Sequence, residues 1–131
     1  MASYGFGKHL RLLTASQYKA VFDAVEFRAG GKQFLLLARH NHCDHARLGL
    51  VIAKKHVRTA VARNQIKRVI RESFRIHQHE LAGLDIIVLA RTGAAGLTKP
   101  TTHTVLIELW RQLLRRKSQH QRNNNGTKDE P

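Results

Sequence analysis

The side chains best suited to chemistry in this chain are cations and one amide that lie close together, and the chemistry they suit is phosphate binding. They are Lys54, Lys55, Arg58, Arg63, Asn64, Lys67, Arg68 and Arg71. Arginine can donate two hydrogen bonds to one phosphate, lysine acts as a point charge, and asparagine can bond phosphate or ribose hydroxyls. From Lys54 to Arg75 the chain has eight cations and a single acid, Glu72. This concentration of charge predicts a binding surface for a polyanion.

A single helix must position most of these side chains. At about 100° per residue, the cations and Asn64 between Arg63 and Arg75 fall within an arc of about 140°. The opposite side carries apolar residues, among them Ala62, Ile66 and Val69. We therefore expect a helix from about Arg58 to His79 that buries one face in its own domain and offers the other to a partner.

Composition narrows the class of partner. The chain has 131 residues, enough for one domain, and 23 Lys and Arg against 9 Asp and Glu give a net charge of +14. Nucleic acid or anionic lipid would relieve this self-repulsion, but the apolar helix face is mostly β-branched, unlike that of a membrane-surface helix. No apolar run of transmembrane length and no signal-peptide pattern is present, and the lone Cys43 excludes an intramolecular disulfide. We expect a cytoplasmic protein with no membrane partner.

The remaining elements follow from periodicity. Thr14 and Gln17 fit a capping box that begins a first helix, whose apolar stripe is Tyr18, Val21, Phe22 and Val25. Strands are expected at 26–29, 33–40, 47–55 and 85–91, with a hairpin joining 33–40 to 47–55. A last helix is expected at about 101–117, burying Leu106, Leu109, Trp110 and Leu113. The order helix, strands, helix, strand, helix predicts a single α+β sandwich.

Three segments are distinguished along the chain. Residues 1–13 form a basic, weakly ordered arm that becomes extended near Leu10–Leu13. Residues 14–117 form the domain. Residues 118–131 form a polar tail that we expect to be disordered, because it has nothing to bury.

One cluster resembles a metal site. His40, His42, Cys43 and His45 offer four potential ligands within six residues, but a closed zinc site normally pairs ligands from two separated segments. The favoured interpretation is a polar hairpin loop, with a functional metal site as the alternative. Paired carboxylates and a nucleophile elbow are not evident, so no catalytic residue and no metal ligand is predicted.

The basic helix also carries a resemblance to a known family. The run A-R-N-Q-I-K-R-V-I-R from Ala62 to Arg71 closely resembles the signature of the bacterial ribonuclease P protein subunit. The flanking runs Gly49–Lys55 and Asp85–Arg91 agree with that family, and the similarity extends from about Leu10 to Arg116. The resemblance implies an αβββαβα sandwich like the second domain of ribosomal protein S5, with a left-handed βαβ crossover.

The same resemblance implies a function. Members of this family are the non-catalytic protein subunit of a ribonucleoprotein endoribonuclease, whose catalytic RNA removes the 5′ leader from precursor tRNA. Mg²⁺ is bound mainly by the RNA, and the protein alone holds no cofactor. The implied partners are the catalytic RNA subunit and precursor tRNA, with no protein partner required.

Residue by residue, the resemblance implies two binding surfaces. The surface for the RNA subunit falls on Arg63, Asn64, Lys67, Arg68 and Arg71, with Lys54, Lys55 and Arg58 at its entry. Gln65 departs from the family, where a second arginine is common at this position. The cleft for the single-stranded leader falls on Tyr18, Phe22, Leu35, Leu37, Leu89 and Arg91. Tyr18 and Phe22, one helical turn apart, can form a platform for stacking bases, and the alternative is that both belong to the core.

Other functions remain as alternatives. A ribosomal or ribosome-assembly RNA-binding protein would share the charge and the fold but would lack a leader cleft. A helix-turn-helix regulator needs a short partner helix directly before the basic one, where a strand is expected here. A metal-dependent nuclease acting alone would need carboxylates that the sequence does not group together.

Overall fold

The computed structural model describes residues 10–129, with side chains described as far as residue 119, and every expected element is present in it. In chain order the elements are α1 (Ala15–Asp23), β1 (Phe27–Gly30), β2 (Phe34–His40), β3 (Arg47–Val51), α2 (Ala60–His77), β4 (Leu84–Ala90), the short 3₁₀ helix η2 (Thr92–Ala94) and α3 (Lys99–Asp129). The order αβββαβα is confirmed. Residues 1–9 of the predicted arm lie outside the described residues.

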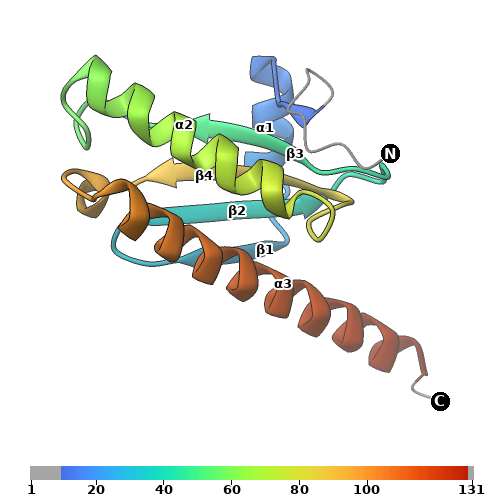
Figure 1. Cartoon of the computed structure of the whole chain (residues 1–131). Coiled ribbons are helices and arrows are strands. Elements are labelled where there is room, and N and C mark those ends of the chain that lie inside the picture. The colour runs from blue at the N-terminus through green and yellow to red at the C-terminus, as the bar shows by residue number, and fades with distance from the viewer. Residues whose placement is uncertain (1–9, 130–131) are drawn as a thin grey trace, which may run out of the picture.

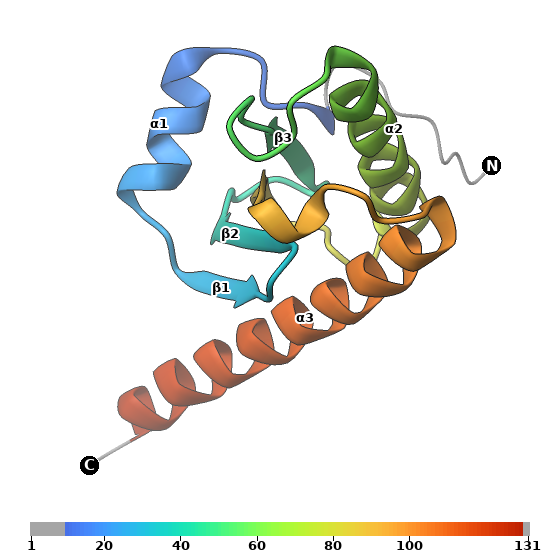
Figure 2. The same cartoon turned by 90° about the vertical axis from the view of Figure 1, so that its left-hand side faces the viewer.

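The four strands form one mixed sheet in the order β1-β2-β4-β3. β4 pairs antiparallel with β2 and parallel with β3, so the expected hairpin between β2 and β3 is wrong. β4 takes an interior position beside β2, because six of its seven residues are buried and only the interior of the sheet covers both faces of such a strand. The chain passes from β3 through α2 into β4, and this crossover is left-handed (Figure 1, Figure 2).

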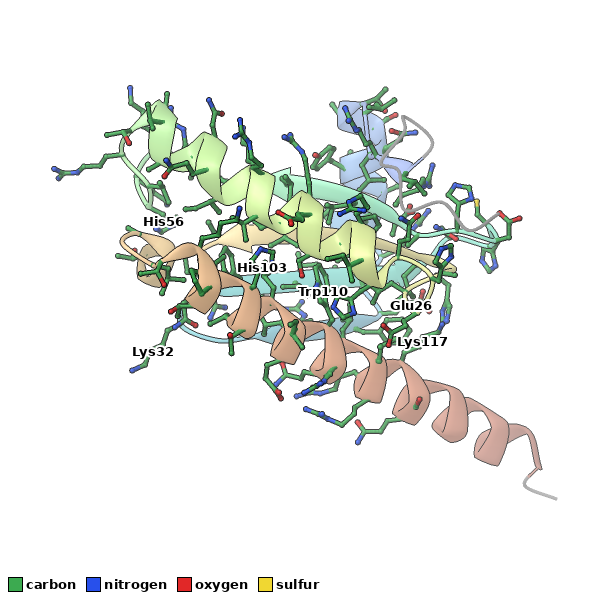
Figure 3. The ribbon with its side chains drawn as sticks, in the orientation of Figure 1. Glu26, Lys32, His56, His103, Trp110 and Lys117 are labelled. Carbon is green, nitrogen blue, oxygen red and sulfur yellow. The ribbon has the colours of Figure 1, made fainter. Side chains whose placement is uncertain are left out.

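Helices cover both faces of the sheet, α2 and α3 on one side and α1 on the other (Figure 2). Side chains alternate along β2, so Phe34, Leu36 and Ala38 point into the main core beneath α2 and α3. Trp110 of α3 is buried between the two helices, and its indole Nε1 donates a 2.8 Å hydrogen bond to Ser73 Oγ of α2 (Figure 3). The predicted apolar stripe of the last helix is therefore confirmed as core.

The α1 side of the sheet holds a smaller cluster. Leu12, Val21 and Ile87 are buried there, with Tyr18 and Leu89 among the half-buried residues packed against them. The Leu12 amide donates to the Leu48 carbonyl at 3.0 Å, so the end of the predicted arm is extended along β3, as expected. The capping box of α1 is also confirmed, because Thr14 Oγ1 accepts from the Gln17 amide at 3.2 Å and Gln17 Oε1 accepts from the Thr14 amide at 3.1 Å.

Two boundaries differ from those expected. β3 ends at Val51 instead of Lys55, because residues 53–57 form a turn in which the Ala53 carbonyl accepts from the His56 and Val57 amides. α3 continues to Asp129, where the sequence predicted a helix ending near Lys117 and a disordered tail. The arginines and lysine after Leu114 are good helix formers, so they extend a helix that the buried stripe has already nucleated.

A buried ion pair fastens β3 to β4. Asp85 is 1% exposed and accepts two hydrogen bonds of 2.7 Å from Arg47, one from Nε and one from Nη2. Asn41 Nδ2 donates to the same carboxylate at 2.9 Å. The hydrogen bond to Asp85 raises the pKa of Arg47 above its ordinary value. The contribution of Arg47 to stability is therefore fully present at neutral pH and is lost as the pH rises through this raised pKa.

We predict that Asp85→Ala lowers the free energy of unfolding by about 3–5 kcal/mol, because it leaves the Arg47 charge without its partner. Urea denaturation followed by circular dichroism measures the change. Asp23→Ala is the matched control, since the Lys19–Asp23 pair is 2.6 Å apart but its side chains are 74% and 61% exposed. The control should cost about 0.5 kcal/mol or less. Similar losses in the two variants would contradict the role given to Asp85.

Candidate nucleic-acid interface

The helix α2 is amphipathic in the way the sequence predicted. Thr59 caps its N-terminus, with Oγ1 accepting from the Ala62 amide at 3.1 Å. Val69, Ile70, Ser73 and Phe74 are buried against the sheet and α3. The cations therefore occupy the outer side of the helix.

The predicted phosphate-binding residues form one surface, which we call the α2 surface. The helix contributes Arg63, Asn64, Lys67, Arg68 and Arg71, and the preceding loop contributes Lys54, Lys55 and Arg58. All are exposed except Arg63 and Lys67, which are half-buried. The α2 surface thus presents six exposed polar or cationic side chains from one helix and one adjoining loop.

Arg63 differs from its neighbours because its guanidinium turns back onto the protein. Nη1 donates to the carbonyl oxygens of Val57 at 3.0 Å and Arg58 at 2.9 Å. These bonds fix the loop that carries Lys55 and Arg58. Arg63 therefore stabilises the loop that contributes to the α2 surface, and it also adds a positive charge to that surface.

The predicted leader-binding residues lie together on the α1 side of the sheet. Leu35 and Leu37 are two residues apart on β2, so they lie on the same face of the sheet. Leu35 is paired directly with Leu89 of β4. Leu35 and Leu89 are half-buried and Leu37 is buried. Arg91 follows β4 and is exposed, with Nη1 donating to the Gly31 carbonyl at 2.7 Å. An apolar row therefore runs across the sheet beside α1, with a cation at its end.

The two aromatic residues of α1 have different surroundings. Phe22 is 44% exposed, as a stacking residue must be. Tyr18 is half-buried, and its hydroxyl accepts from the Leu50 amide at 3.0 Å on the outer edge of β3. Its ring lies so close to Gly49 that a Cβ there would come within 2.8 Å of Cε2. The Tyr18 hydroxyl thus satisfies a backbone amide of an edge strand, and Phe22 is the more exposed of the two aromatic rings of α1.

Sequence reasoning missed two cations on this side of the sheet. Arg28 of β1 is paired with Leu37, so it lies on the same face, and it is exposed. Arg39 follows Leu37 by two residues on that face, and its Nη1 donates to the Ala20 carbonyl of α1 at 3.4 Å. The alternation of side chains along β2 could have placed Arg39 on the same face as Leu37 from the sequence alone. Arg28 could be placed on that face only once the pairing of β1 with β2 was known.

The histidine-rich loop is held by its own hydrogen bonds. Asn41 Nδ2 donates to the His45 carbonyl at 3.1 Å, and Asn41 Oδ1 accepts from the Cys43 amide at 2.8 Å. His40 packs edge-on against Phe27 at 5.1 Å between ring centroids. Across the described residues, no three His, Cys, Asp or Glu side chains gather as a group that could hold a metal ion. Within the same residues, no helix has the length and apolar character to span a bilayer.

Comparisons with known proteins identify the family. The ribonuclease P family model matches residues 6–114. The ribonuclease P protein component of Pseudomonas aeruginosa is 54% identical over 115 residues, covering 88% of this chain and 85% of the relative. That of Ectopseudomonas mendocina is 52% identical over 132 residues, covering 100% and 98%.

Solved structures agree with these relatives. The Staphylococcus aureus RNase P protein superposes with a TM-score of 0.72 at 31% identity, covering 78% of this chain and 93% of that one. The Thermotoga maritima RNase P protein gives 0.67 at 28% identity, covering 80% and 96%. With the αβββαβα order and the basic α2, these matches show that the chain belongs to the ribonuclease P protein family. Membership assigns it to tRNA processing as a component of a ribonucleoprotein.

Proposed function

We propose that this chain assists the catalytic RNA of ribonuclease P in the endonucleolytic removal of the 5′ leader from precursor tRNA, and that it acts in the cytoplasm. The observation that carries the proposal is the family match, which spans residues 6–114 and therefore the whole packed domain. The structure supports it with two distinct surfaces, one basic and one apolar with cations beside it.

The α2 surface is the proposed site for the RNA subunit. Those of its cations that belong to α2 lie on one side of a helix whose other side is buried, so these charges are held at fixed spacing. Forked arginines and lysine point charges suit phosphates of a folded RNA, where neighbouring strands repel each other. Neutralising those phosphates also releases counterions, which favours association at low salt.

The α1 side of the sheet is the proposed site for the leader. Phe22, Leu35 and Leu89 offer apolar contact to unstacked bases, while Arg28 and Arg91 lie on the same side to meet the backbone. Every base has a flat face, so stacking on such a surface tolerates any leader sequence. Tolerance of this kind suits a protein that meets many different precursors.

In this proposal the RNA subunit catalyses the hydrolysis and binds most of the Mg²⁺. In this chain the buried carboxylate of Asp85 already accepts hydrogen bonds from Arg47 and Asn41. The protein's contribution is to screen phosphate repulsion and to hold the leader, both of which strengthen the binding of substrate and of Mg²⁺ to the complex.

Genetic complementation tests this function in a cell. In a bacterial strain depleted of its own ribonuclease P protein, expression of this chain should restore growth and remove the accumulated 5′-extended precursor tRNAs, measured by northern blot. A chain that leaves the precursors in place, although it is expressed and folded, would contradict the proposal. Glu108→Ala, a change at an exposed residue of α3 outside both proposed sites, serves as the control for expression.

A further inference from the structure

A pocket of about 890 Å³ lies beside the α2 surface, between the first half of α2 and the segment that joins β4 to α3. Its floor is apolar, with Val57, Val69 and Ala94 buried and Ala62, Ile66 and Leu97 half-buried. His56 Nδ1 lies 2.9 Å from Thr92 Oγ1, which joins the loop before α2 to η2 at one end of the pocket (Figure 3). The volume is in the range of sites that hold small organic ligands.

The rim of the pocket is cationic. Lys55, Arg58, Arg68 and Lys99 are all exposed and line it, and the lining residues, which all belong to the described part of the chain, include no Asp or Glu. The N-termini of α2 and α3 lie at the same end of the molecule (Figure 1), so their dipoles add positive potential there. An apolar floor beneath a ring of cations fits an aromatic ligand that carries negative charge.

We propose that this pocket holds one unpaired nucleotide of an RNA, with the base on the apolar floor and the neighbouring phosphates on the cationic rim. The inference rests on the proposed function and specifies the form of RNA that the α2 surface meets. A ligand made of phosphates alone would bind the cationic rim but would make no use of the apolar floor. A base inside a duplex cannot enter a pocket, so the nucleotide must be unstacked.

Gln65 gives the pocket a polar group that can bond the base. Its amide, exposed on the rim, has both a donor and an acceptor. A glutamine amide can bond an adjacent donor and acceptor on one base simultaneously, as at N6 and N7 of adenine. An adenine nucleotide is therefore a suitable probe of the pocket.

Filling the pocket tests the proposal without changing charge. Ala95 lines the pocket and is exposed, so Ala95→Trp should insert an indole where the base would lie and still fold. The Kd of the full chain for a bacterial ribonuclease P RNA should rise about tenfold, the loss of one stacked base. The slope of log K against log salt should stay unchanged, because no phosphate contact is removed.

Val61→Trp is the matched control, since Val61 is 68% exposed near the same end of α2 but does not line the pocket. It should bind the RNA like the unchanged chain, and Gln65→Ala should weaken binding without changing the salt slope. Equal losses in Ala95→Trp and Val61→Trp, or no loss in Ala95→Trp, would overturn the proposal.

A second measurement does not depend on the RNA subunit. In methyl NMR spectra of the full chain, 5′-AMP should shift the signals of Ala62, Ile66 and Leu97, and these shifts should vanish in Ala95→Trp. Inorganic phosphate should leave them in place. If the RNA subunit does not bind but 5′-AMP gives these shifts, the proposed function fails and the pocket stands. If the RNA binds but 5′-AMP and phosphate act alike, the pocket proposal alone fails.

Discussion

The fourfold variant Lys54→Ala, Arg58→Ala, Arg68→Ala, Arg71→Ala is expected to bind the ribonuclease P RNA about 10³- to 10⁴-fold more weakly than the unchanged chain in 0.1 M salt. Each removed cation forfeits roughly one phosphate contact and its counterion release, worth close to one power of ten at this salt concentration. All four side chains are exposed, so the fold should remain intact. A filter-binding titration across a salt series measures the affinity and its slope, which should fall by about 3 to 4.

A charge-matched control distinguishes the effect of the α2 surface on RNA affinity from the effect of the overall net charge. The variant Lys19→Ala, Arg111→Ala, Arg115→Ala, Arg116→Ala also removes four exposed cations, but from α1 and α3. It should retain most of the affinity and most of the salt slope. If the two variants lose affinity equally, the RNA responds to the overall charge of +14 and not to the α2 surface.

Phe22→Ala is expected to weaken binding of leader-bearing precursor tRNA to the reconstituted complex about 5- to 150-fold, while binding of mature tRNA is unchanged. The range corresponds to the loss of about 1–3 kcal/mol for one stacked base. Phe22 is 44% exposed, so its removal costs the protein little of its core. Fluorescence titration with the two tRNAs measures the difference.

Two controls accompany this prediction. Val61→Ala removes another exposed apolar side chain, on α2, and should affect neither tRNA. Tyr18→Phe keeps the aromatic ring but removes the hydroxyl that bonds the Leu50 amide, so it should lower stability without selective loss of the leader. Equal losses for precursor and mature tRNA in Phe22→Ala would exclude Phe22 from the leader site.

Local patterns were sufficient for the elements and for the α2 surface. The capping box at Thr14, the apolar stripe from Leu106 to Leu113 and the cationic arc on α2 each depend on residues within a few turns of one another. Helical and strand periods report such relationships directly, which is why these predictions agree with the structure.

Long-range relationships could not be read from periodicity. The placement of β4 between β2 and β3 overturned the expected hairpin, because pairing depends on which strand needs both faces covered. Helical spacing placed Tyr18 beside Phe22, but only the tertiary structure shows the Tyr18 hydroxyl on the edge of β3. Likewise Arg63 has the spacing of a surface cation, whereas its hydrogen bonds to Val57 and Arg58 depend on how the loop before α2 turns.

The most direct measurement is cleavage of a 5′-labelled precursor tRNA at low Mg²⁺, by a bacterial ribonuclease P RNA alone and together with this chain. We predict that cleavage at the mature 5′ end is restored only when both are present, and that the fourfold α2 variant fails to restore it at the same concentration. A chain that binds RNA but never restores cleavage would contradict this account. That result would favour the alternative of a ribosomal or ribosome-assembly RNA-binding protein.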